Sequence, residues 1–208
     1  NRSILWTGLL RFGIFTSRVA ALEIAEPLAL RLPLGDDQER RAAFTKLIVT
    51  MKNVPTERRL AILEAVRVAA RIEDLSPLRG IMMSWEQVRE MHRSGMIFGA
   101  HTLTHPNLPN ATPEEARTEI VGSRDALAAQ LGERVRHFSY PNGRGSAHLT
   151  DAIKQTVRDA GFDSATTSLT GSVTLGDDLL ALRRIGIYSR HGALPEFTLE
   201  IERGKIGA

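Results

Sequence analysis

Apolar residues recur at three- and four-residue spacing in the first third of the chain, a period typical of helices with one buried face. The stripe that follows Asp36 consists of Ala43, Phe44, Leu47, Ile48 and Met51. A second stripe follows Pro55 and consists of Leu60, Leu63, Val66 and Ala70. The pattern therefore predicts a helical pair over residues 36–72, interpreted as an insertion over the main body. Residues 1–35 are apolar without a clear period, and we expect an irregular segment there.

The rest of the chain alternates strand-like runs with helical stripes. Strands are predicted at residues 96–100, 135–140, 164–167 and 182–188, with an alternating edge strand at 196–201. Helix starts are indicated by Ser84 with Gln87, by Thr112-Pro113 and near Thr150, and helix ends by Gly95, Gly132 and Gly161. This alternation predicts an α/β domain with parallel strands, either open or closed into a barrel.

Composition and charge narrow the function classes. A chain of 208 residues fits one domain, and no apolar run reaches the roughly 18 residues of a membrane span. Cysteine is absent, which excludes disulfides and thiolate metal sites. The net charge is only +3, the basic residues are scattered and aromatics make up 5%. A nucleic-acid-binding face would need clustered basic residues with aromatics, so we expect no nucleic-acid partner.

Two histidines stand out at the end of a predicted strand. His101 and His105 are four residues apart and follow the apolar run at residues 96–100. Functional groups of parallel α/β folds collect just past the C-terminal ends of strands, and one turn would bring both rings to the same side. Two neutral imidazoles could then bind one metal at about 2.0–2.1 Å. A pair of solvated loop histidines fits the same spacing, and both interpretations stay open.

A second candidate feature is the turn Tyr140-Pro141-Asn142-Gly143, which again follows a predicted strand. Backbone N–H groups in such a turn can stabilise a developing oxyanion. Pro-Asn-Gly is also ordinary turn chemistry, so the motif alone does not decide between the two interpretations.

The order of these motifs adds information that none of them carries singly. The run from Ser84 through the histidine pair, the Thr-Pro-Glu-Glu helix start, "FSYPNG", "GFDSATTS" and "LRRIGIY" resembles the polysaccharide deacetylase family, the NodB-like domain of carbohydrate esterase family 4. The resemblance covers about half the chain, to Tyr188. It implies a distorted (β/α) barrel and metal-dependent hydrolysis of acetyl groups from N-acetylated sugars of a polysaccharide or oligosaccharide.

The resemblance also implies roles for individual residues. His101 and His105 match two ligands of a divalent metal, usually zinc. Pro141 matches the proline of a groove-lining motif, so Tyr140 and Pro141 are candidate substrate-binding residues. The backbone N–H of Asn142 would then contribute to the oxyanion hole. Arg184 resembles an arginine found near the site in one branch of the family.

The chain departs from the family pattern at several positions. Ser139 stands where the family has an arginine of the groove motif, and Asn142 stands in the tyrosine place. The late histidine motif that supplies a general acid is not recognisable, since His191 lacks its context. The Asp-Asp motif that supplies a general base and a third metal ligand does not occur before Ser84. We interpret Asp36-Asp37 as a helix cap and Asp177-Asp178 as a turn.

These departures leave a metal site with two ligands and no base, whereas a catalytic zinc site needs three protein ligands and a base for its water. We therefore expect residues 1–208 to be a single domain of this family that is partial at the N-terminus, with the first strand and helix missing. The alternative is a catalytically silent carbohydrate-binding relative. The resemblance favours the cell envelope or secretion, and the sequence leaves the oligomeric state open.

Overall fold

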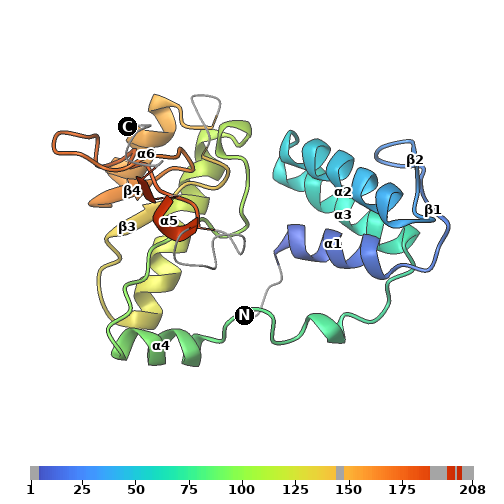
Figure 1. The fold of residues 1–208 in the computed structure, drawn as a ribbon, viewed down its shortest axis with the longest axis horizontal. Helices are drawn as coiled ribbons and strands as arrows, with labels where there is room; N and C mark the ends of the chain where they lie inside the picture. The colour runs from blue at the N-terminus through green and yellow to red at the C-terminus, as the bar shows by residue number, and fades with distance from the viewer. Residues whose placement is uncertain (1–4, 144–147, 188–195, 200, 203–208) are drawn as a thin grey trace. The chain divides into compact units, whose positions relative to one another are not determined.

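The computed structural model describes residues 5–143, 148–187, 196–199 and 201–202. The chain divides into two compact units, residues 1–94 and residues 95–208 (Figure 1). Each unit has its own secondary structure and is described by itself.

The predicted helical pair is present in the first unit. Helix α2 spans Asp37–Lys52 and α3 spans Thr56–Ala69. The Asp36 carboxylate accepts a hydrogen bond from the backbone N–H of Glu39, which makes this aspartate the N-cap of α2, as expected. Pro55 stands at the N-cap position of α3 and separates the two helices.

The expectation of an irregular segment before residue 36 is wrong. Helix α1 spans Trp6–Thr16, and strands β1 (Ala21–Ile24) and β2 (Leu30–Pro33) form an antiparallel hairpin. The helix has no side-chain N-cap and is apolar around most of its circumference, which hides the period. Its buried residues nevertheless lie at helical spacing: Trp6, Leu10, Gly13 and Ile14.

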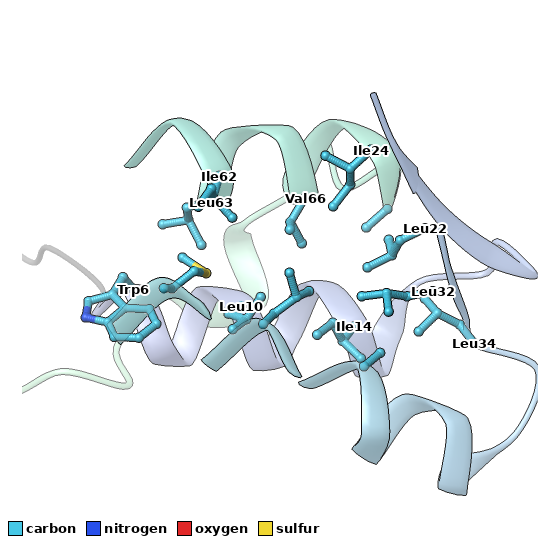
Figure 2. Close-up of a cluster of buried hydrophobic side chains, with 14 residues drawn as sticks. Trp6, Leu10, Ile14, Leu22, Ile24, Leu32, Leu34, Ile62, Leu63 and Val66 are labelled. Carbon is cyan, nitrogen blue, oxygen red and sulfur yellow. The ribbon is translucent and has the colours of Figure 1, made fainter. Parts of the chain in front are cut away.

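Apolar side chains from α1, α2, α3, β1 and β2 form one buried cluster (Figure 2). Leu10 of α1, Leu22 of β1, Leu47 of α2 and Ile62 of α3 have no exposed surface. Fully burying one such side chain contributes about 1.5–3 kcal/mol, so this cluster is the main source of stability of the unit. The helical pair is thus part of a core, while its assignment as an insertion in a single domain stays a prediction.

The chain continues through a 3-10 turn, η1 (Ser76–Leu78), to helix α4 (Trp85–Arg93). Ser84 caps α4 in a reciprocal capping box with Gln87, as the sequence predicts. Gly95 follows in the left-handed region at φ +91°, where glycine avoids the steric cost that a side chain imposes.

Parallel pairing organises the second unit. Strands β3 (His137–Ser139) and β4 (Ser164–Thr166) pair in parallel. Ala100 forms a parallel bridge with β3, and Leu182 forms a parallel bridge with β4. Four neighbouring chain segments therefore run in one direction, which confirms the expectation of parallel strands.

Helices complete this unit. Helix α5 spans Pro113–Leu131 after a short 3-10 turn, η2 (Leu108–Asn110), and α6 spans Asp151–Asp159 and packs on α5. The predicted start and end of α5 are confirmed by a capping box at Thr112 and a left-handed Gly132. Among the described residues, no helix is both long and apolar enough to pass through a membrane.

Two of the predicted strands, those on either side of β3 and β4, are reduced to single bridging residues. Residues 96–100 do not form a buried strand: only Ala100 pairs, and Ile97 is 81% exposed. In the predicted strand at 182–188, only Leu182 forms a bridge, and Tyr188 lies outside the described residues.

The predicted edge strand at 196–201 is also wrong, because residues 196–199 and 201–202 are helical. Alternation over so short a segment does not distinguish a strand from a helix that is exposed around much of its circumference. The α/β character is confirmed. The distorted barrel stays a prediction, because the described residues form two two-stranded sheets and no closed one.

Candidate functional site

The predicted site residues meet where the parallel segments end. The N–H of Ala100 donates to the carbonyl of His137 at 2.8 Å, and its carbonyl accepts from the N–H of Ser139 at 2.9 Å. His101 is therefore the first residue after the segment that pairs with β3. Its Nδ1 lies 2.7 Å from the Ser139 carbonyl oxygen. Because a carbonyl only accepts, Nδ1 carries a proton, and the neutral tautomer with this bond has its lone pair on Nε2.

A tight turn carries the second histidine. Thr102 and His105 both lie in the left-handed region, at φ +65° and +58°, and the Thr102 hydroxyl accepts from the N–H of His105 at 3.1 Å. The imidazole rings of His101 and His105 meet edge to face, with centroids 5.0 Å apart and an interplanar angle of 75°. The structure thus brings the two predicted histidines together.

Glu119 of α5 holds this turn, and the sequence analysis missed it. The carboxylate accepts from the N–H of Leu103 at 2.7 Å, the N–H of Thr104 at 2.8 Å and the Thr104 hydroxyl at 2.5 Å. Glu119 as a whole is only 8% exposed to solvent. The available signal was an acidic residue on the apolar stripe of α5 between Ala116 and Ile120, a position that a carboxylate occupies only with partners.

The turn after β3 adopts a conformation suited to an N–H donor. Asn142 is left-handed at φ +57°, and within the described part of the chain its backbone N–H donates to no protein acceptor. Pro141 and Gly143 on either side are buried. A Cβ on Gly143 would lie 3.0 Å from the Cβ of Tyr140, so glycine avoids a tight contact in this turn. The described residues thus leave the N–H of Asn142 without a protein acceptor.

Tyr140, predicted to bind substrate, is 1% exposed. Its hydroxyl donates to the carbonyl of Leu180 at 2.9 Å, and its ring packs edge to face on Phe138. Burial, with the negative charge of Asp178, raises the pKa of this hydroxyl, which keeps it protonated. These contacts favour a structural role for Tyr140, and the substrate contact stays a prediction.

Arg184 is connected to the same turn through one intermediate residue. Its Nη2 donates to the Ser168 hydroxyl at 2.8 Å, and the N–H of Ser168 donates to the carbonyl of Gly143 at 2.8 Å. Arg184 is itself exposed. The arginine therefore presents a cation at the margin of the turn.

The other candidate carboxylates have local partners. Asp177 accepts from the N–H and hydroxyl of Thr174 within one turn. Asp178 pairs with Lys154 at 2.9 Å, and the hydrogen bond from that ammonium is the main cause that lowers the pKa of Asp178. Among the described residues, no three His, Asp or Glu side chains gather as metal ligands, and His191 lies outside those residues.

Comparisons with known proteins identify similar sequences and structures. The family model described as polysaccharide deacetylase matches residues 50–165. The Bacillus subtilis protein YxkH, named as a polysaccharide deacetylase, is 26% identical over 102 residues, which are 49% of this chain and 35% of that protein.

The chain is also similar to solved structures of proteins described as deacetylases. The Streptococcus pyogenes deacetylase PplD, in complex with acetate, is 27% identical, with a TM-score of 0.53, over 61% of this chain and 54% of that one. The Bacillus anthracis polysaccharide deacetylase BA0330 is 27% identical, with a TM-score of 0.50, over 57% of this chain and 36% of that one. The chain thus spans between about a third and about half the length of these relatives.

The matched region contains the histidine turn, Glu119 and the Asn142 turn, whereas Arg184 lies outside it. The family model covers more than half of the sequence. This chain belongs to the polysaccharide deacetylase family.

Proposed function

We propose that this chain forms part of the catalytic site of a metal-dependent deacetylase that hydrolyses the acetamide C–N bond of N-acetylated sugars in a polysaccharide or oligosaccharide. The observation that carries the proposal is the ring contact of the two histidines, with His101 bonded to Ser139, the last residue of β3, three residues before Asn142. Active sites of parallel α/β folds lie at such strand ends.

His101 and His105 are the proposed ligands of the metal, with zinc as the first candidate. The Nδ1–H of His101 bonds to the Ser139 carbonyl, the outer-shell contact that typically orients a metal-binding imidazole. Two imidazoles on one tetrahedral zinc, with nitrogens about 2.0–2.1 Å from the metal, have ring centres roughly 5 Å apart. The observed 5.0 Å fits this requirement.

The remaining residues have complementary roles in the proposal. A bound divalent metal supplies a Lewis acid and lowers the pKa of water. The Asn142 N–H donates to the acetamide oxygen as negative charge develops on it, an interaction that stabilises the transition state more than the substrate. Arg184, held to the turn through Ser168, offers further donors to the substrate. No general base or third ligand is assigned to a described residue.

The first test combines zinc binding with turnover. Isothermal titration of the 208-residue chain with Zn²⁺ is compared with the His101→Ala, His105→Ala double variant, and acetate release from an N-acetylated chito-oligosaccharide is measured in parallel. Zinc binding that the double variant loses supports the proposed ligands. Equal binding by both proteins contradicts them.

A second experiment, on full-length protein with zinc supplied, separates the binding-only alternative. Saccharide that binds to that protein without release of acetate would favour a catalytically silent relative. The Streptococcus pyogenes relative is described as a deacetylase, which does not favour that alternative.

A further inference from the structure

Glu119 is the buried acidic residue that the proposed chemistry leaves without a role. Its carboxylate accepts three hydrogen bonds, from two backbone N–H groups and one hydroxyl. All three donors belong to Leu103 and Thr104, the residues midway between His101 and His105. A helix side chain therefore bonds to the turn at the point that sets the direction of both imidazoles.

The turn needs such support because of its backbone conformation. Thr102 and His105 are left-handed, at φ +65° and +58°, a region that β-branched and bulky side chains rarely occupy. Residues in such conformations persist only where surrounding interactions determine them. Within the turn the Thr102 hydroxyl bonds to the N–H of His105, and the bonds to Glu119 come from outside it.

We infer that Glu119 is a positioning residue, which fixes the Thr102–His105 turn so that both imidazoles can bind one divalent metal. The inference rests on the proposed function for its metal and on the described hydrogen bonds for its mechanism. Glu119 does not contact the metal in this inference, because its carboxylate is occupied by the turn.

Three variants of the 208-residue chain test this inference. Glu119→Ala removes all three acceptor contacts. Glu119→Gln keeps an oxygen for the two N–H groups and offers an NH₂ donor to the Thr104 hydroxyl, which can accept it. Glu114→Gln is the matched control, because Glu114 lies on the exposed side of the same helix.

Two readouts distinguish positioning from a general structural role. Hydrogen exchange at the backbone amides of Leu103 and Thr104 reports the turn, and Zn²⁺ titration reports the histidines. We expect Glu119→Ala to lose protection at both amides and to bind Zn²⁺ about 10–100-fold more weakly, the usual effect of removing an outer-shell partner. Glu119→Gln and Glu114→Gln should lose less than about tenfold in Zn²⁺ affinity, below the loss that removal of an outer-shell partner causes.

The outcomes are separable. Unchanged amide protection and zinc affinity in a folded Glu119→Ala variant would overturn the inference, even if the melting temperature falls. A wild type that binds no Zn²⁺ would contradict the proposed metal site, and loss of protection at the two amides would still support the role of Glu119 in the turn. If Glu119→Ala does not fold, Thr104→Val removes the hydroxyl donor alone, and unchanged amide exchange and zinc affinity there would count against the inference.

Discussion

Residues 1–94 and residues 95–208 both bury apolar side chains, but they differ in their strand pairing and in where the candidate site lies. The first unit has one apolar cluster to which three helices and a hairpin contribute (Figure 2). The second unit has short parallel strands, and the candidate site residues gather where those strands end. Every residue assigned a role in the proposal lies in the second unit.

The two units also differ in where their left-handed non-glycine residues lie. Among the described residues, the first unit has left-handed non-glycine residues at Ala29, in the hairpin loop, and at Arg71, after α3. In the second unit such residues are Thr102, His105 and Asn142, all in the two turns of the site. Left-handed residues at a helix end or in a hairpin loop belong to ordinary chain reversals, whereas those of the second unit lie in the two candidate functional turns, where such conformations often occur.

The largest expected effect on metal binding is at the two histidines of the second unit. We expect His101→Ala and His105→Ala each to weaken Zn²⁺ binding by more than the roughly 10–100-fold typical of an outer-shell partner, because each removes a proposed ligand. The melting temperature should change little, since His101 is exposed and His105 half-buried. Calorimetric titration and thermal denaturation measure the two effects, with His92→Ala on α4 as the control. Wild-type zinc affinity in either variant would refute the ligand assignment.

Substitutions in the core of the first unit should lower stability and leave zinc affinity unchanged. Leu10→Ala is expected to lower the free energy of unfolding by about 2–5 kcal/mol, because Leu10 is fully buried in the apolar cluster. Zinc affinity measured under native conditions should stay unchanged. Leu60→Ala, at an exposed position of α3, is the control and should change stability by less than about 0.5 kcal/mol. Urea denaturation measures the stabilities, and a matching loss in both variants would refute the assigned core.

Tyr140 tests whether a buried residue of the second unit has a structural role or binds substrate. Tyr140→Phe should lower the free energy of unfolding by about 1–3 kcal/mol, because the buried carbonyl of Leu180 loses its donor. Saccharide affinity should stay at the wild-type value if Tyr140 is structural. Chemical denaturation and saccharide titration decide this, and a variant with unchanged stability but weakened saccharide binding would restore the predicted substrate contact.

The smallest expected effect concerns Asp178 and its ion pair with Lys154. The pKa of Asp178 is lowered in the folded state, so the pair stabilises the protein fully above the unfolded aspartate pKa of about 3.9 and loses this effect as the pH falls through the lowered value. Asp178→Asn should cost at most about 1 kcal/mol at neutral pH, because the carboxylate is partly exposed. Unfolding curves from pH 7 to pH 2 test this, and a difference that persists at the lowest pH would contradict it.

Local signals in the sequence determined much of the secondary structure. The capping box at Ser84, the helix start at Thr112, the glycine that ends α5 and the cap at Asp36 act through neighbouring residues, and all were predicted correctly. Helix α1 was missed because its apolar residues cover most of its surface, so only packing reveals which face is buried. The segment at 96–100 was expected to be buried because it is apolar, but burial depends on neighbours, and Ile97 lies exposed.

The sequence by itself determined the family and the two histidines, because motif order and a four-residue spacing are one-dimensional features. Only the tertiary structure decided what holds those histidines. The Ser139 carbonyl fixes the tautomer of His101 from 38 residues away, and Glu119 holds the turn from the next helix. The physical reason is that a hydrogen bond forms between groups that are close in space, and folding alone brings these groups together.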